Sequence, residues 1–200
     1  MAFCILVSGP PASGKSTIAR KIGETLRLPV VSKDDIKEIL FDEIGFSSRA
    51  EKVRLGNAAT ALMYDSARRV LQTGQSVILE NNFENASRAG LLRLQEDCGC
   101  ALLHVRLGGD LRAIYAGYVE RNESPDRHRG HVVNDRYPET EPGVAVPPLS
   151  YADFSRGVRE RGMCDFDIGA TLMDVDATQI EQMDAVLLAG RIRKWMEMNG

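Results

Sequence analysis

The sequence has no large excess of charge of either sign. Its 25 lysine and arginine residues nearly balance 28 aspartate and glutamate residues, and the formal net charge is -3. The two signs are mixed along the chain, whereas a protein that holds a long nucleic-acid backbone needs a sustained positive field. We therefore expect a small or short substrate, and we do not expect long nucleic acid as a partner.

Cysteine is scarce and follows no motif. Cys4, Cys98, Cys100 and Cys164 form neither a CxxC pair nor a repeated Cys/His spacing. This absence argues against a zinc site and against a disulfide framework. We expect free, buried thiols in a reducing compartment.

Long apolar runs are also missing. No stretch reaches the roughly 18 consecutive apolar residues of a membrane span, and the apolar start Met1–Val7 has no basic leader. The sequence therefore predicts no membrane segment and no signal peptide, and it favours a cytoplasmic protein. Because the chain has 200 residues and is 44% hydrophobic, we expect a single domain over residues 1–200 with an inserted lid.

Apolar periodicity indicates strands and helices that alternate along the chain. Short apolar runs predict strands at Ala2–Val7, Val30–Ser32, Val77–Leu79, Ala101–Leu107 and Thr171–Val175. Helical spacing predicts helices from Lys15, over Ile36–Ile44, Glu51–Leu71, Ala86–Cys98 and Leu111–Arg121, and near the end from Ile180 to Ile192. This alternation is typical of α/β proteins, and it predicts a parallel sheet between two layers of helices.

One long segment interrupts the alternation. Asn122–Ser150 is rich in proline and has little periodicity. A loop of this length inside a compact domain is usually a functional lid or a disordered segment. We expect a lid over about residues 121–150, and we expect the helical segment at about residues 35–73 to form much of the acceptor pocket.

The most specific motif is a phosphate-binding loop. Gly9–Ser16 satisfies GxxxxGK[ST] between a buried strand and an amphipathic helix. Backbone N–H groups can surround phosphates there, Lys15 at the surface of the loop would reach the β- and γ-phosphates, and the Ser16 hydroxyl would coordinate Mg²⁺. The expected nucleotide-binding residues are Gly9, Pro10, Pro11, Ala12, Ser13, Gly14, Lys15, Ser16 and Thr17.

Two aspartates follow the second predicted strand. Asp34 and Asp35 would lie at the carboxyl edge of the sheet, where parallel α/β proteins gather their ligands. One of them could accept the proton of an attacking hydroxyl, and the alternative is that they cap the next helix. We assign the catalytic role to Asp34 and the capping role to Asp35.

Four motifs in this order resemble small P-loop kinases. They are Gly9–Thr17, Val31–Lys37, Val77–Phe83 and Arg127–His131. The group they resemble is similar to phage polynucleotide 5′-kinase, chloramphenicol phosphotransferase and the zeta toxins. The resemblance implies a three-layer P-loop kinase fold with a five-stranded parallel sheet in the order 2-3-1-4-5. It also implies that Asp34 activates the acceptor hydroxyl, and Lys37 stands where the polynucleotide kinase has an arginine.

Charged residues outside these motifs complete the expected site. Glu80 ends the third strand, where P-loop proteins often carry a carboxylate for Mg²⁺ or its water shell; a partly exposed strand-end carboxylate is the alternative. The resemblance implies that lid arginines stabilise the transferring phosphate, and the candidates are Arg121, Arg127 and Arg129. A solvated loop whose charges are offset by nearby carboxylates is the alternative for this segment.

Together these residues predict an ATP- and Mg²⁺-dependent phosphotransferase that moves the γ-phosphate to a hydroxyl of a small molecule. Candidate acceptor contacts are Asp35, Lys37, Arg49, Arg54 and Asn82. Two alternatives stay open, a polynucleotide 5′-hydroxyl kinase and a nucleotide-binding regulatory ATPase.

Overall fold

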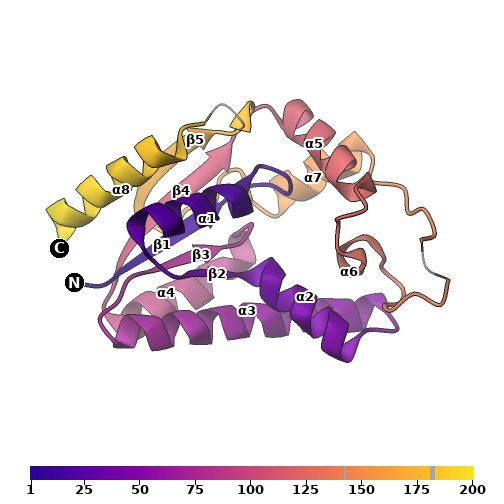
Figure 1. Cartoon of the computed structure of the whole chain (residues 1–200), viewed down its shortest axis with the longest axis horizontal. Coiled ribbons are helices and arrows are strands. Elements are labelled where there is room, and N and C mark those ends of the chain that lie inside the picture. Colours follow the sequence, from indigo (N-terminus) through magenta and orange to yellow (C-terminus); the bar gives the residue numbers. More distant parts are fainter. Residues whose placement is uncertain (142, 181–182) are drawn as a thin grey trace.

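A five-stranded parallel sheet forms the centre of the computed structural model, which describes residues 1–141, 143–180 and 183–200 (Figure 1). The strands are β1 (Phe3–Ser8), β2 (Val30–Ser32), β3 (Val77–Glu80), β4 (Ala101–Gly108) and β5 (Thr171–Asp176). Their order is β2-β3-β1-β4-β5, and every neighbouring pair is parallel. The predicted α/β architecture and strand order are confirmed.

The helices follow the predicted alternation, with two additions. They are α1 (Lys15–Leu26), α2 (Lys33–Ile44), α3 (Arg49–Gln72), α4 (Arg88–Cys98), α5 (Leu111–Glu123), α6 (Arg129–Val132), α7 (Tyr151–Glu160) and α8 (Ala185–Asn199), with a 3-10 turn at Asn85–Ser87. Neither α6, within the lid, nor α7 was predicted, although Ser150 caps α7, and Phe154 and Val158 are buried there at helical spacing. None of the helices within the described ranges combines the length and apolarity of a bilayer span.

The start of α2 corrects the assignment of a cap to Asp35. Helix α2 begins at Lys33, three residues before the predicted start, because the Ser32 hydroxyl accepts the N–H of Asp35 (3.3 Å) and is itself the N-cap. Asp34 and Asp35 therefore lie in the first helical turn, where a negative charge interacts favourably with the helix dipole.

Two apolar clusters hold helices against the two faces of the sheet. On one face, Ile22 of α1 and Ile192 of α8 are buried with alternate residues of the central strands. On the other face, Met63 of α3 and Leu91 of α4 are buried in the second cluster. Strand β1 is buried along its whole length, which explains its continuous apolar sequence. The layers bring the carboxyl ends of all five strands to one edge.

The lid, residues 124–150, arches from α5 to α7 over the far ends of α2 and α3 (Figure 1). It contains the short helix α6, and Pro142 within it lies outside the described residues. Val133 of the lid is buried together with Phe41 and Phe46, and an antiparallel bridge joins Phe46 to Tyr137. The predicted lid therefore rests on the predicted acceptor segment.

Candidate active site

The phosphate-binding loop joins β1 to α1 in a backbone conformation that depends on glycine. Gly9 has a φ of 147° and Gly14 a φ of 79°. A Cβ atom at Gly9 would lie 2.3 Å from the carbonyl oxygen of Leu107, so no larger residue fits there. The Gly9 N–H donates to the backbone oxygen of Asn82 (3.4 Å), so the segment that follows β3 supports the loop. The N-terminus of α1 follows, and its dipole favours an anion.

Lys15 lies inside the loop, and its predicted surface position was wrong. The residue is 6% exposed, and its Nζ donates to the carbonyl oxygen of Pro10 (2.9 Å). Burial lowers the pKa of Lys15, although the charges of Glu80 and Asp34 act in the opposite direction. Ser13 Oγ is also buried, and it has no hydrogen-bond partner among the described residues. A buried ammonium and an unused hydroxyl fit a loop that receives phosphate oxygens.

Asp34 faces this loop from the first turn of α2. Its carboxylate is half-buried. Burial would raise the pKa of Asp34, but the charges of His131, Lys37, Lys15 and Arg127 together outweigh it and hold the pKa below its ordinary value. The carboxylate is therefore ionised at neutral pH and able to accept a proton.

Glu80 is buried at the end of β3, so the alternative of a partly exposed carboxylate is excluded. It is 3% exposed, and its Oε2 accepts the hydroxyl of Ser32 (2.7 Å). Burial raises the pKa of Glu80, while Lys15 and the Ser32 hydrogen bond lower it. Glu80 and the hydroxyl of Ser16, at the start of α1, supply only oxygen donors. Oxygen is the donor that Mg²⁺ prefers, so these residues fit the expected metal.

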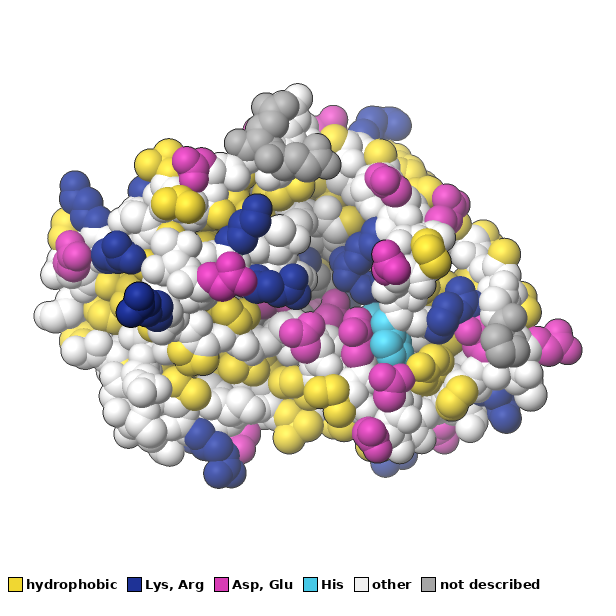
Figure 2. Space-filling model, in the orientation of Figure 1, with side chains coloured by type: hydrophobic (Ala, Val, Ile, Leu, Met, Phe, Trp, Pro, Cys, Tyr) yellow, Lys and Arg dark blue, Asp and Glu magenta, His cyan; other side chains and the backbone are white. Residues whose placement is uncertain are grey.

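Two of the three candidate arginines are close enough to the phosphate-binding loop for their charges to act on Lys15. Arg121 is in the last turn of α5, Arg127 is in the lid, and both are half-buried. Their charges act on the pKa of Lys15. Burial and Arg121 lower the pKa of Arg127, and Asp34 opposes this change. Figure 2 shows that the middle of this face is hollowed and that basic and acidic side chains line the hollow.

Arg129 is engaged within the lid. Its Nε donates to Glu139 (2.7 Å), and its Nη2 donates to the carbonyl oxygen of Val144 (2.8 Å). The Glu139 hydrogen bond raises the pKa of Arg129. A role of Arg129 at the transferring phosphate stays a prediction, and it requires that this internal pairing be broken.

Comparison with known proteins agrees with this geometry. Residues 4–136 match the family described as the AAA domain. The chain belongs to this family. Within the AAA domain family, its fold and phosphate-binding loop are those of the P-loop phosphotransferases. The narrower resemblance to polynucleotide kinase, chloramphenicol phosphotransferase and zeta toxins stays a prediction.

Individual proteins resemble the chain to different extents. A crystal structure of a candidate kinase from Chloroflexus aurantiacus is 31% identical, with a TM-score of 0.72 over 96% of this chain and 97% of that chain. APS kinase from Mycobacterium tuberculosis, solved with AMPPNP and APS, shares the fold alone: it is 14% identical, with a TM-score of 0.57 over 98% of each chain. An uncharacterized protein of M. tuberculosis is 34% identical over 128 residues, which are 58% of this chain. The chain spans about a quarter of the length of that curated relative.

The candidate acceptor contacts of this AAA-family chain divide into separate places. Lys37 is half-buried near Asp34, with its Nζ 5.2 Å from the centre of the Phe41 ring. Arg49 donates to Asn134 Oδ1 of the lid (2.5 Å). Asp35 is exposed, and Asn82 uses its backbone oxygen to support Gly9. Arg54 lines a cavity at the turn between α2 and α3.

The sequence did not reveal the contacts that hold the lid on α3. Lys52 is 5% exposed, and its Nζ donates to the carbonyl oxygens of His131 (3.0 Å) and Val133 and to Asn134 Oδ1 (3.2 Å). Burial and the charges of Lys37, Arg49 and Arg127 lower the pKa of Lys52 to about 7. One sequence signal could have indicated that Lys52 is buried: it lies four residues before Gly56, on the buried side of the helix.

A second missed contact lies directly below the phosphate-binding loop. His104 of β4 is 2% exposed, and its Nε2 is 2.6 Å from Ser8 Oγ, one residue before Gly9. Burial and the charge of Arg106 lower the pKa of His104 to about 4, so the ring is neutral at neutral pH. A lone histidine within an apolar strand gives no sequence signal for such a partner.

Proposed function

We propose that the chain transfers the γ-phosphate of ATP to a hydroxyl group of a small molecule. The observation that carries this proposal is the convergence on one residue of the phosphate-binding loop: the charges of Asp34, Glu80 and Arg127 all act on Lys15. An ionised carboxylate beside a phosphate site supplies a base, and the cations supply charge stabilisation. A loop that only bound nucleotide would need the cations but not the base.

The nucleotide end of the site uses the loop, its lysine and Arg127. Backbone N–H groups at the start of α1 and the Lys15 ammonium hold the phosphates, and Ser13 Oγ offers a further contact. Lys15 must exchange its bond to Pro10 for a phosphate oxygen. Ser16 and Glu80 would hold Mg²⁺, which when bound neutralises negative charge on the phosphates.

Asp34 acts at the acceptor end. Its carboxylate takes the proton of the acceptor hydroxyl as the acceptor oxygen forms a bond to the γ-phosphorus and the bond to the ADP oxygen breaks. The products are ADP, the phosphorylated acceptor and a proton on Asp34, which then passes to water. The low pKa of Asp34 keeps it unprotonated before each turnover. Arg127, whose charge acts on both Lys15 and Asp34, stabilises the negative charge of the transferring group.

The acceptor is a small molecule because the lid rests on the α2–α3 hairpin. Phe41, Phe46 and Val133 are buried together between the lid and this hairpin, and this packing leaves less room for a long polymer than for a small molecule. Lys37 is the half-buried cation near Asp34 on the acceptor side. The formal charge of -3 also opposes a long polyanion.

A screen with labelled ATP tests the proposal. The 200-residue chain is incubated with ATP, Mg²⁺ and pools of sugars, nucleosides, hydroxy acids, antibiotics and a 5′-hydroxyl oligonucleotide, and products are identified by mass spectrometry. We expect one class of small molecule to gain a phosphate with stoichiometric ADP. Transfer to the oligonucleotide alone would favour the polynucleotide kinase. ADP formation that no acceptor stimulates, with no phosphorylated product, would favour the regulatory ATPase.

A further inference from the structure

A second cavity lies outside the phosphate-binding site. It has a volume of about 600 Å³ and lies between the α2–α3 turn, the first turns of α3 and lid residues 136–138. Its walls include neither the phosphate-binding loop nor Asp34, Glu80 or Arg127. A volume of this size accommodates a small organic molecule. The cavity is therefore separate from the groups that carry the proposed transfer.

The walls of this cavity combine apolar surface with positive charge. Phe46, Leu55 and Tyr137 form an apolar part, and Arg54 and Arg136 bring two guanidinium groups to the same space. Neither guanidinium group has a hydrogen-bond or ion-pair partner within residues 1–141, 143–180 and 183–200. A cavity with an apolar wall and two guanidinium groups is complementary to a molecule with an apolar body and an anionic group.

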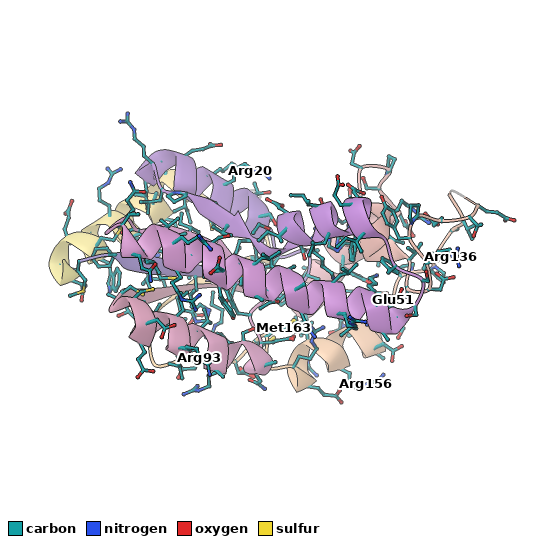
Figure 3. All side chains as sticks on the ribbon, turned by 90° about the horizontal axis from the view of Figure 1, so that it is seen from below. Arg20, Glu51, Arg93, Arg136, Arg156 and Met163 are labelled. Carbon is teal, nitrogen blue, oxygen red and sulfur yellow. The ribbon has the colours of Figure 1, made fainter. Side chains whose placement is uncertain are left out.

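The acidic residue of the cavity is already engaged. Glu51 Oε2 accepts the backbone N–H of Ser47 (2.6 Å), which holds its carboxylate at the start of α3. Figure 3 shows Glu51 and Arg136 at the same end of the molecule, one on α3 and the other on the lid. The two arginines therefore leave an excess of positive charge over the single carboxylate.

The cavity spans the seam that joins the lid to the acceptor segment. Phe46 and Tyr137 exchange two backbone hydrogen bonds of 2.8 Å, and their rings stack with centroids 6.1 Å apart. Gly45, with a φ of 70°, permits this approach, since a Cβ atom there would lie 2.6 Å from the Tyr137 carbonyl oxygen. A molecule in the cavity contacts both sides of the seam.

We propose that this cavity binds a small organic anion with an apolar body and that the bound anion holds the lid against α2 and α3. The anionic group lies between Arg54 and Arg136, and the apolar body lies against Leu55 and Tyr137. Because one guanidinium belongs to α3 and the other to the lid, the ligand binds the docked lid more tightly than an undocked one. It therefore shifts the lid toward the docked state.

Binding of simple probes tests the site without nucleotide. Phenyl phosphate and phenylacetate are the anionic probes, and benzyl alcohol is the neutral one, each titrated into the full chain and followed by amide chemical shifts. We expect saturable binding of the anions and at least tenfold weaker binding of benzyl alcohol. Arg54→Gln and Arg136→Gln should each weaken the anions about tenfold, the scale of one charge-assisted hydrogen bond. Arg69→Gln is the matched control, because Arg69 is exposed on the same helix and already paired with Asp65.

Three outcomes would overturn this proposal. Loss of probe binding in Lys15→Ala would mean that the anions occupy the phosphate-binding loop instead. Equal affinity for benzyl alcohol, or affinities unchanged by both arginine substitutions, would remove the anion site. The clamping role has its own readout: bound phenyl phosphate should slow hydrogen exchange of the Phe46 and Tyr137 amides at least fivefold, and unchanged exchange at saturation would contradict it. None of these measurements depends on phosphate transfer.

Discussion

Acid should destabilise the fold through His104, the buried ring beneath the phosphate-binding loop. The pKa of His104 is lowered from 6.5 to about 4 in the folded chain. Between these values the unfolded chain binds the proton more readily than the folded chain, so the free energy of unfolding falls as pH decreases. The contribution of His104 to the free energy of unfolding is fully present above about pH 6.5 and is lost as pH falls toward 4. At roughly 1.36 kcal/mol per pH unit, the loss amounts to about 3 kcal/mol.

A neutral replacement separates His104 from the other groups that titrate in acid. His104→Gln keeps a side chain that can bond to Ser8 Oγ and has no charge at any pH. Urea unfolding is measured for both proteins at pH 7, 6, 5 and 4. We expect wild type to lose about 3 kcal/mol more stability than the variant between pH 7 and pH 4. Parallel curves for the two proteins would refute the assignment of a low pKa to this buried ring.

The remaining predictions concern phosphate binding, the lid and the metal. Lys15→Ala should lower turnover by at least ~10² while ATP still binds weakly, and normal turnover would reject the phosphate assignment. Lys52→Met removes the donors to three lid oxygens, so trypsin should cut the lid at least several-fold faster. An unchanged rate of lid cleavage, followed by mass spectrometry, would show that Lys52 does not hold the lid on α3. Glu80→Gln keeps the Ser32 contact but loses charge, so half-maximal activity should need about tenfold more Mg²⁺. An unchanged Mg²⁺ requirement would remove Glu80 from the metal site.

The sequence predicted those parts of the fold that depend on residues close together in the chain. Strand β1 is buried on both faces and therefore reads as a continuous apolar run, and the GxxxxGK[ST] loop carries its chemistry in consecutive residues. Helix α7 was not predicted, although its sequence carries a signal: a serine cap stands before apolar residues at helical spacing.

The contacts that sequence reasoning missed join residues far apart in the chain. The Phe46–Tyr137 bridge connects the α2–α3 turn with the lid, and the Lys52 contacts connect α3 with it. Periodicity within either segment does not reveal such a pairing. The two contacts of Ser32 were also missed: its hydroxyl caps α2 and donates to Glu80. That double role is visible only when β2 and β3 lie side by side.

The most direct test of the proposed chemistry compares Asp34→Asn with Asp35→Asn. Asp34 is half-buried among cations at the phosphate-binding loop, whereas Asp35 is exposed in the same helical turn. Each substitution removes one carboxylate with little change in size, so the two variants are matched controls. With an acceptor identified by the screen, we expect Asp34→Asn to lower phosphate transfer by ~10² or more, with ATP affinity within a few-fold of wild type. Asp35→Asn should retain most of the transfer rate. Normal transfer by Asp34→Asn would contradict the assignment of the base, and loss of transfer in Asp35→Asn alone would move that role to its neighbour.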